Sequence, residues 1–198
     1  MPTKKTLNSL ELVWEAPTKS VIQGTTNQDL PGAWKLMLLG DGSPTRHLQL
    51  LTGHEVSVKV ISMEIENSLS KSTPKEVNEI EPPFIRRQVW LQCGDKTLAW
   101  AESWWNIDEA KHHLKNKNQP IWRSLTQGRS ELFREVDGLA LANAKWLEST
   151  FERKGPFWTR HYRFFRNGKE LTVIREVFSP ELENWLGPVE RKSVETNI

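Results

Sequence analysis

The alternation of apolar and polar positions along the chain predicts five β-strands. Val56, Val58 and Val60 alternate with polar residues, and a run of similar character covers residues 85–92, which is the two-residue period of a strand. Turn residues at 93–96 lead into a further run over 98–105, and Asn167-Gly168 separates runs over 158–166 and 169–178. Asn-Gly between two strand-like runs is the strongest short signal for a β-hairpin. The pattern therefore predicts an α+β fold with one antiparallel sheet that includes residues 56–61, 85–92, 98–105, 158–166 and 169–178.

The other segments predict short helices and loops. Residues 33–39 and 108–114 have the composition of short helices, and residues 130–151 carry apolar side chains at roughly helical spacing, with a break expected at Gly138. Residues 63–83 hold five Glu and two Lys without a period, which is typical of a surface loop. We expect a loosely attached segment over 1–30, one domain over 31–182 and a C-terminal tail over 183–198.

Composition narrows the class of protein. The 198 residues suit one domain with a real core, and the net charge of +2 gives no electrostatic case for binding nucleic acid or a membrane surface. A single cysteine excludes an internal disulfide framework, no apolar run is long enough to span a bilayer, and no signal core follows the N-terminus. These features predict a cytoplasmic protein, which we expect to be a monomer. Ten Trp against one Tyr indicate a core or pocket with large flat apolar walls.

Most signatures of catalysis or metal binding are missing from the sequence. It has no paired-cysteine motif and no His-Glu-x-x-His. Gly40-Asp41-Gly42 lacks the Lys-Ser/Thr of a phosphate loop and predicts a plain turn, and no base neighbours Cys93 in sequence. The adjacent pair His112-His113 is a poor candidate for metal binding, because neighbouring helix residues do not face each other.

Arg87 is the residue that the strand pattern leaves unexplained. In a strand over 85–92, it shares a face with Ile85, Val89 and Leu91. That face is aliphatic and should be buried, yet an arginine is almost never fully buried without a partner. Arg87 therefore predicts an anion inside the fold, either a structural carboxylate or the carboxylate of a ligand.

Several segments resemble the chorismate lyase family in order and spacing. The run from Leu38 to Arg46 is similar to a Leu-Leu-x-Asp-Gly-Ser-x-Thr-Arg stretch of that family, and the strand of Arg87 resembles its strand with an essential arginine. The resemblance spans about residues 34–180, and its further matches are Val56-Ser57-Val58, Pro120-Ile121, Trp158-Thr159-Arg160, Asn167-Gly168-Lys169 and Glu176-Val177-Phe178-Ser179-Pro180. Ser103-Trp104-Trp105-Asn106 and the run from His47 to Leu51 resemble the cyanobacterial and plastid branch.

The resemblance implies a reaction and a site. It implies a sheet with helices that cover a pocket, and removal of pyruvate from chorismate to leave 4-hydroxybenzoate for quinone synthesis, plastoquinone in that branch. No metal or other cofactor is implied, because the elimination makes the ring aromatic. By position, Arg87 binds the ring carboxylate, Glu176 meets the ring hydroxyl, the backbone N–H of Ile121 is a second carboxylate donor, and Thr45 belongs to the substrate-binding residues. A planar guanidinium can hold a carboxylate with two parallel hydrogen bonds.

The residues also leave alternatives open. Arg87 and Glu176 could form a buried ion pair with each other, and the strand pattern does not decide which face of 169–178 is buried. Arg160, Arg46 and Lys59 could add positive potential to a pocket, but a surface or structural role is the more common one for such cations.

Two departures from the family pattern and one other class of function also stay open. Pro44 has no backbone N–H to donate, and Trp122 stands where many members have glycine, so that it could reshape or fill the mouth of the pocket. The same type of fold serves as a small-molecule sensing module in some transcription regulators, so the chain could bind a carboxylated aromatic without converting it. No helix-turn-helix segment accompanies it in this sequence.

Overall fold

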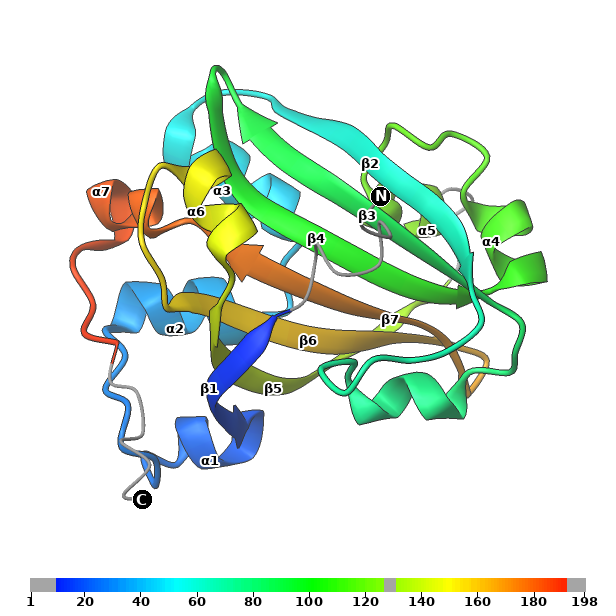
Figure 1. Cartoon of the computed structure of the whole chain (residues 1–198), viewed down its shortest axis with the longest axis horizontal. Coiled ribbons are helices and arrows are strands. Elements are labelled where there is room, and N and C mark those ends of the chain that lie inside the picture. Colours follow the sequence, from blue (N-terminus) through cyan, green and yellow to red (C-terminus); the bar gives the residue numbers. More distant parts are fainter. Residues whose placement is uncertain (1–9, 127–130, 192–198) are drawn as a thin grey trace, which may run out of the picture.

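The computed structural model describes residues 10–126 and 131–191 of the chain. Its centre is one seven-stranded antiparallel sheet with the strand order β1-β5-β6-β7-β4-β3-β2 (Figure 1). In that order the strands are β1 (Glu11–Pro17), β5 (Phe133–Asn143), β6 (Phe157–Arg166), β7 (Lys169–Phe178), β4 (Lys96–Asn106), β3 (Phe84–Cys93) and β2 (Val56–Glu66). The predicted α+β fold with a single antiparallel sheet is confirmed.

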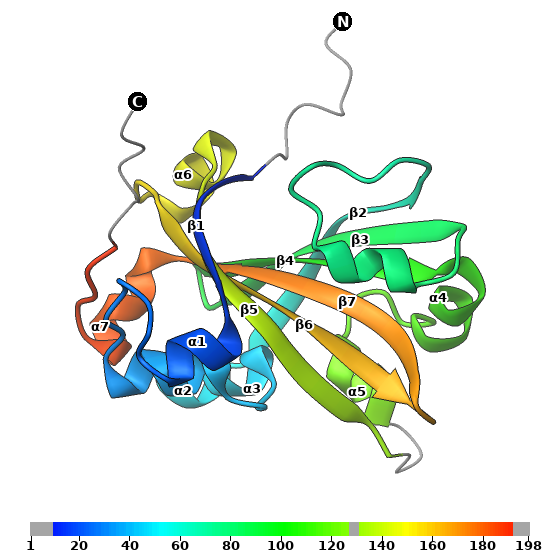
Figure 2. The ribbon, with the colours of Figure 1, turned by 90° about the horizontal axis from the view of Figure 1, so that it is seen from below.

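Short helices cover both faces of this sheet, as Figure 2 shows. One face carries α1 (Thr18–Ile22), α2 (Gly32–Leu39), α3 (Pro44–Thr52), α5 (Ile121–Thr126) and α7 (Glu183–Leu186). The other carries α6 (Lys145–Phe151) and the 3-10 helix η2 (Lys75–Glu79), while α4 (Ile107–His113) follows the end of β4 and the 3-10 helix η3 (Pro180–Leu182) precedes α7. Helices α2 and α4 match the two predicted short helices.

Tryptophans fill the core on both sides of the sheet. Trp34 and Trp158 belong to the core under α2 and α3, and Trp100 belongs to the core under α6. Trp104 packs against η2 on one face, and Trp105 packs against α4 and α5 on the other. All five side chains are fully buried, so the interpretation of the tryptophans as core residues is confirmed for these five.

Two predicted assignments are wrong in the same way. The stretch 130–151 was expected to be helical, but residues 133–143 form β5 and only 145–151 form the helix α6. Within the predicted surface loop 63–83, β2 continues to Glu66 and η2 occupies 75–79. Each strand contains a register shift, between Val136 and Gly138 in β5 and between Val60 and Ser62 in β2. Beyond a β-bulge of this kind, the side chains that would have pointed to one face of the sheet point to the other. The two-residue period on which a strand prediction depends is therefore lost.

The terminal segments contribute to the fold. Residues 11–17 form β1 and pair with β5 along the edge of the sheet, which corrects the predicted loose attachment for this part of 1–30. At the other end, Leu186 of α7 is buried, and the indole Nε1 of Trp34 donates to the carbonyl of Gly187 at 2.8 Å. These contacts attach residues 11–17 to the edge of the sheet and residues 186–187 to α2.

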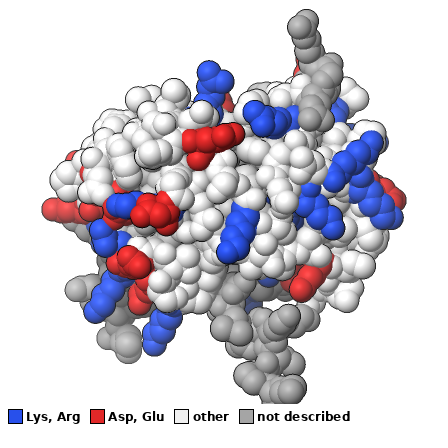
Figure 3. Space-filling view, turned by 90° about the horizontal axis from the view of Figure 1, so that it is seen from above, with Lys and Arg blue, Asp and Glu red and all other residues white. Residues whose placement is uncertain are grey.

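One face of the molecule carries charges of both signs. On the face shown in Figure 3, cationic and anionic side chains are interspersed. No helix in the described ranges 10–126 and 131–191 has the length and hydropathy needed to cross a membrane.

Candidate functional site

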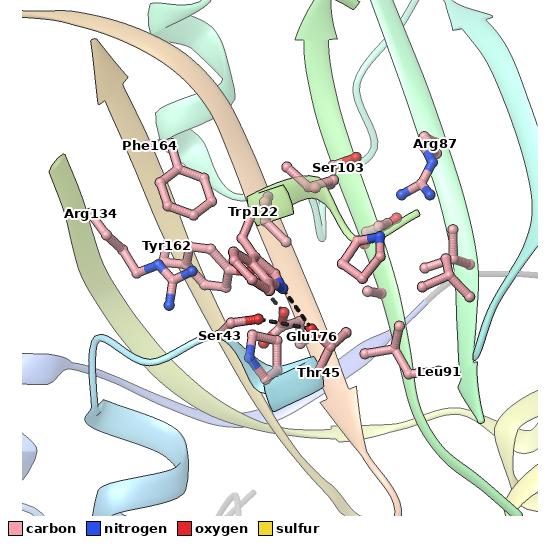
Figure 4. Close-up of a pocket in the computed structure, with 18 residues that line it drawn as sticks. Ser43, Thr45, Arg87, Leu91, Ser103, Trp122, Arg134, Tyr162, Phe164 and Glu176 are labelled. Carbon is pink, nitrogen blue, oxygen red and sulfur yellow. Dashed lines mark hydrogen bonds between the residues drawn. The ribbon is translucent and has the colours of Figure 1, made fainter. Parts of the chain in front are cut away.

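A pocket lies over the middle of the sheet on the side of α3 and α5 (Figure 4). Its floor is formed by inward-facing residues of β3, β4, β7 and β6, and residues at the start of α3 and α5 close it from above. The enclosed cavity between these walls has a volume of about 40 Å³. The four residues predicted from the sequence, Arg87, Glu176, Ile121 and Thr45, all line this pocket.

Arg87 is buried in β3 without a carboxylate partner among the described residues. Its side chain is only 2% exposed. One terminal nitrogen, Nη2, donates to the backbone carbonyl of Lys117 at 2.6 Å and lies 3.5 Å from the carbonyl of Gln119. The buried Nε has no hydrogen-bond partner. Burial lowers the pKa of Arg87 to about 10, so the guanidinium stays positive at neutral pH, and its charge meets only neutral carbonyl dipoles.

Glu176 is fixed on the central strand β7 by two donors. Arg160 Nε donates to Oε2 of Glu176 at 2.8 Å, and the hydroxyl of Tyr162 donates to Oε1 at 2.8 Å. All three side chains are at least 97% buried, because β7 lies fourth of seven strands and is covered on both faces. The alternative in which Arg87 and Glu176 neutralise each other is wrong, since each has other partners.

Arg160 is a structural cation. Besides Glu176, it contacts the end of α2, where its Nη1 donates to the carbonyls of Met37 at 3.0 Å and Leu38 at 3.2 Å. Cationic groups are favourable beside the last carbonyls of a helix. Arg46 and Lys59, the other two cations considered from the sequence, are exposed, and they do not line the pocket.

A short chain of hydrogen bonds joins the two segments above the floor. The hydroxyls of Ser43 and Thr45 are 2.8 Å apart, and the indole Nε1 of Trp122 donates to Oγ1 of Thr45 at 2.9 Å. Figure 4 shows these side chains beside Glu176. Trp122 therefore lines the pocket and ties α5 to α3. Ile121 precedes it as the first residue of α5, so its N–H belongs to the helical turn that has no intrahelical acceptor.

The sequence did not reveal two other residues of the pocket, Tyr162 and Arg134. Tyr162 is the single tyrosine of the chain, and burial together with the charge of Glu176 raises its pKa, so its hydroxyl remains a donor at neutral pH. Arg134 lies on β5 next to the register shift, and the helical assignment of that stretch hid its position. A correct strand assignment would have placed it on the same face as Val136, toward the pocket.

Metal binding finds no support in the described part of the chain, 10–126 and 131–191, where no three His, Cys, Asp or Glu side chains lie together as potential ligands. His112 and His113 pack edge to face, with ring centroids 4.6 Å apart, and His113 contacts Glu109 at 3.3 Å. Cys93 is buried, and burial raises the pKa of its thiol, which disfavours the reactive thiolate.

Known structures of similar shape include those of PhnF from Mycobacterium smegmatis. The effector domain of PhnF from Mycobacterium smegmatis superimposes with a TM-score of 0.52 at 9% identity, covering 71% of this chain and 90% of that domain. The PhnF structure that covers 82% of this chain and 77% of its own gives a TM-score of 0.53 at 10% identity. At such low identity, these likenesses show that the fold is shared and say nothing of function.

Comparison of sequences finds relatives of much higher identity than these structures. The protein ycf21 of Porphyra purpurea, described as uncharacterized, is 39% identical over 163 residues, covering 80% of this chain and 87% of its own. The uncharacterized ycf21 of Cyanophora paradoxa is 32% identical over 171 residues, covering 86% of this chain and 89% of its own. The model of one family, described as chorismate pyruvate-lyase Rv2949c-like, matches residues 38–186, a range that contains every pocket residue discussed above. The chain therefore belongs to the Rv2949c-like chorismate pyruvate-lyase family.

Proposed function

We propose that this protein is a chorismate lyase that eliminates pyruvate from chorismate and leaves 4-hydroxybenzoate. The observation that carries the proposal is the pocket itself: a buried arginine with an unfilled Nε–H and a fixed carboxylate line the same mostly apolar cavity. Membership of the family supplies the reaction. The geometry supplies groups suited to the two polar ends of the aromatic product.

The reaction needs positioning more than it needs an added reagent. The bond between ring carbon 3 and the ether oxygen breaks, the hydrogen on ring carbon 4 is lost, and a proton is gained at the methylene carbon of the side chain. The ring becomes aromatic, the side chain leaves as pyruvate, and no atom is gained or lost overall. Holding the substrate in the reactive conformation in a dry, preorganised pocket is the contribution expected of the protein.

We assign the roles as follows. Arg87 binds the ring carboxylate through its free Nε–H, and the backbone N–H of Ile121 is a second donor to the same group. Glu176 accepts a hydrogen bond from the ring hydroxyl. Each carboxylate oxygen has two lone-pair positions, so Glu176 can accept this bond while it keeps those from Arg160 and Tyr162. Thr45 lines the wall of the pocket at the start of α3, where the indole Nε1 of Trp122 donates a hydrogen bond to its hydroxyl.

A second function is favoured by the shared fold alone. The chain could be a binding module for a carboxylated aromatic that performs no reaction. The likeness to the effector domain of PhnF is compatible with this alternative, but the same pocket serves either function. Turnover of chorismate distinguishes the lyase from the binding module.

The test is incubation of the purified chain with chorismate, with and without a metal chelator. Pyruvate is followed by a coupled dehydrogenase, and the aromatic product is identified by chromatography. We expect equimolar pyruvate and 4-hydroxybenzoate, and no effect of the chelator. Tight binding of 4-hydroxybenzoate without pyruvate release would contradict the lyase and support the binding module. The 3-hydroxy isomer as product would keep the reaction class and remove the proposed role in quinone synthesis, for which we propose the plastoquinone ring as the destination of 4-hydroxybenzoate.

A further inference from the structure

Arg134 is a second arginine of the pocket, and the roles assigned above do not use it. It extends from β5, and its guanidinium carbon lies 4.7 Å from the ring centre of Tyr162 and 4.6 Å from that of Phe164 (Figure 4). A guanidinium against two aromatic rings is held by cation–π attraction and by packing. The group is therefore fixed at one end of the pocket.

The hydrogen bonds of Arg134 use one side of its guanidinium. Nη1 donates to the carbonyls of Asp41 and Gly42, both at 2.6 Å, and this contact holds the loop that precedes α3. The buried Nε has no hydrogen-bond partner. Nε and Nη2 form the other edge of the fork, which is the edge that binds a carboxylate with two parallel hydrogen bonds. No carboxylate of the described residues lies within 4.0 Å of this guanidinium.

The register of the sheet places Arg134 across the pocket from Arg87. A cross-strand row runs from Arg87 on β3 to Tyr162 on β6, and Arg134 lies opposite Phe164, two residues along β6 from Tyr162 on the same face. Four strand intervals of about 4.8 Å put the backbones of β3 and β5 roughly 19 Å apart. Both arginines line the same pocket, and they approach it from strands at opposite ends of this row.

The charges around the pocket also match a dianion. Arg160 and Glu176 neutralise each other, which leaves Arg87 and Arg134 as two positive charges without a carboxylate. His47 lies under the loop at Gly42, and burial and the charges of Arg160 and Arg134 lower its pKa, so it is neutral at pH 7. The pocket therefore presents two unneutralised cations, one at each end.

We propose that Arg134 binds the second carboxylate of a dicarboxylate ligand and makes the pocket prefer dicarboxylates to monocarboxylates. This inference rests on the proposed function: the ring carboxylate of chorismate meets Arg87, and the carboxylate of its enolpyruvyl side chain meets Arg134. Elimination then cuts the ligand between its two anionic ends. The 4-hydroxybenzoate that remains makes no contact with Arg134, so the pocket binds the product more weakly than it binds the substrate.

Binding of unreactive aromatic probes tests the assignment. The dicarboxylate probe is 3-(1-carboxyethoxy)-4-hydroxybenzoate, its matched control carries an amide in place of the side-chain carboxylate, and 4-hydroxybenzoate is the monocarboxylate. By calorimetry, we expect the wild-type protein to bind the dicarboxylate at least tenfold more tightly than the amide. Arg134→Gln should remove that preference and leave the affinity for 4-hydroxybenzoate within twofold. Arg46→Gln makes the same change of charge at an exposed position and should alter neither.

Other outcomes would overturn the assignment. Equal affinity of the wild-type protein for the acid and the amide would overturn it. This comparison needs no variant, so it remains decisive if Arg134→Gln does not fold. Loss of affinity for all three probes alike in Arg134→Gln would mean that the residue only holds the loop at Asp41 and Gly42. Failure of the proposed function gives a different pattern: no pyruvate from chorismate, with the preference for the dicarboxylate intact.

Discussion

Replacing Arg87 by methionine separates ligand binding from stability. Methionine is an apolar side chain that retains much of the length of arginine and lacks its charge. In the folded protein, the guanidinium makes one good hydrogen bond, to the carbonyl of Lys117 at 2.6 Å, and a marginal one to Gln119 at 3.5 Å. Loss of one charge-assisted bond costs about 1.5–3 kcal/mol, but the variant no longer buries a cation without a counter-charge, which is itself costly. We therefore expect the free energy of unfolding to change by less than about 2 kcal/mol.

Ligand affinity should fall as well. The charge-assisted hydrogen bond from the free Nε–H of Arg87 to a ring carboxylate is worth about 1.5–3 kcal/mol, so the dissociation constant for 4-hydroxybenzoate should rise roughly tenfold to a hundredfold. Arg87→Lys keeps the charge without the planar fork and should recover only a small part of this loss. Calorimetric titration gives the affinity, and urea unfolding gives the stability. An Arg87→Met protein that binds 4-hydroxybenzoate within threefold of wild type would refute the assigned role. A loss of stability above about 4 kcal/mol would refute the account of Arg87 as a cation without a structural counter-charge.

Two buried carboxylates outside the pocket should set opposite pH dependences of stability. Glu76 Oε2 lies 3.3 Å from His161 Nε2, and interaction with that ring lowers the pKa of Glu76 to about 2; Glu76→Gln should lower the free energy of unfolding by about 2–3 kcal/mol at pH 7. The gap should close as the pH falls from 4.5 toward 2 in urea unfolding, and a gap that stays constant would contradict this. Burial raises the pKa of Glu170 to about 7 despite its contact with Arg163, so the wild-type protein should lose stability between pH 4.5 and 7, because the unfolded chain releases this proton earlier. Glu170→Gln should lack that decline, and parallel curves for the two proteins would disprove it.

The sequence predicted the strands whose alternation continues without interruption. Asn167-Gly168 does connect β6 to β7, and the turn at 93–96 does connect β3 to β4. Strand β5 was missed because its register shift next to Gly138 interrupts the period. The glycine was interpreted as a break in a helix, but it allows close packing instead: an added Cβ would lie 2.8 Å from the ring of His161 and 3.2 Å from the carbonyl of Ala16. Such a requirement comes from two other strands and leaves no trace in the local sequence.

The residues of the candidate site were likewise predicted only in part from the sequence. An arginine on an aliphatic strand face is visible in the sequence, and Arg87 is indeed buried there. The sequence could not show whether Glu176 is its counter-charge, because this depends on which cation the folded sheet places beside Glu176. In the structure that partner is Arg160, directly opposite on β6. Arg134 was out of reach for the same reason as β5: its side chain points toward the pocket only in a register that the local pattern conceals.

The composition of the pocket also determines when it can exist during folding. Its walls come from the start of α3, from β3, from the start of α5 and from the hairpin β6–β7, which are separated by long stretches of chain. A short stretch of the chain therefore holds only a portion of the binding groups, and we expect a ligand to bind the folded domain and not the unfolded chain. Bound ligand thus acts as a reversible cross-link between distant segments, and a concentration of 100 times its dissociation constant would add about 2.7 kcal/mol to the free energy of unfolding. In a cell, the supply of ligand would then help to set how much of this protein escapes proteolysis.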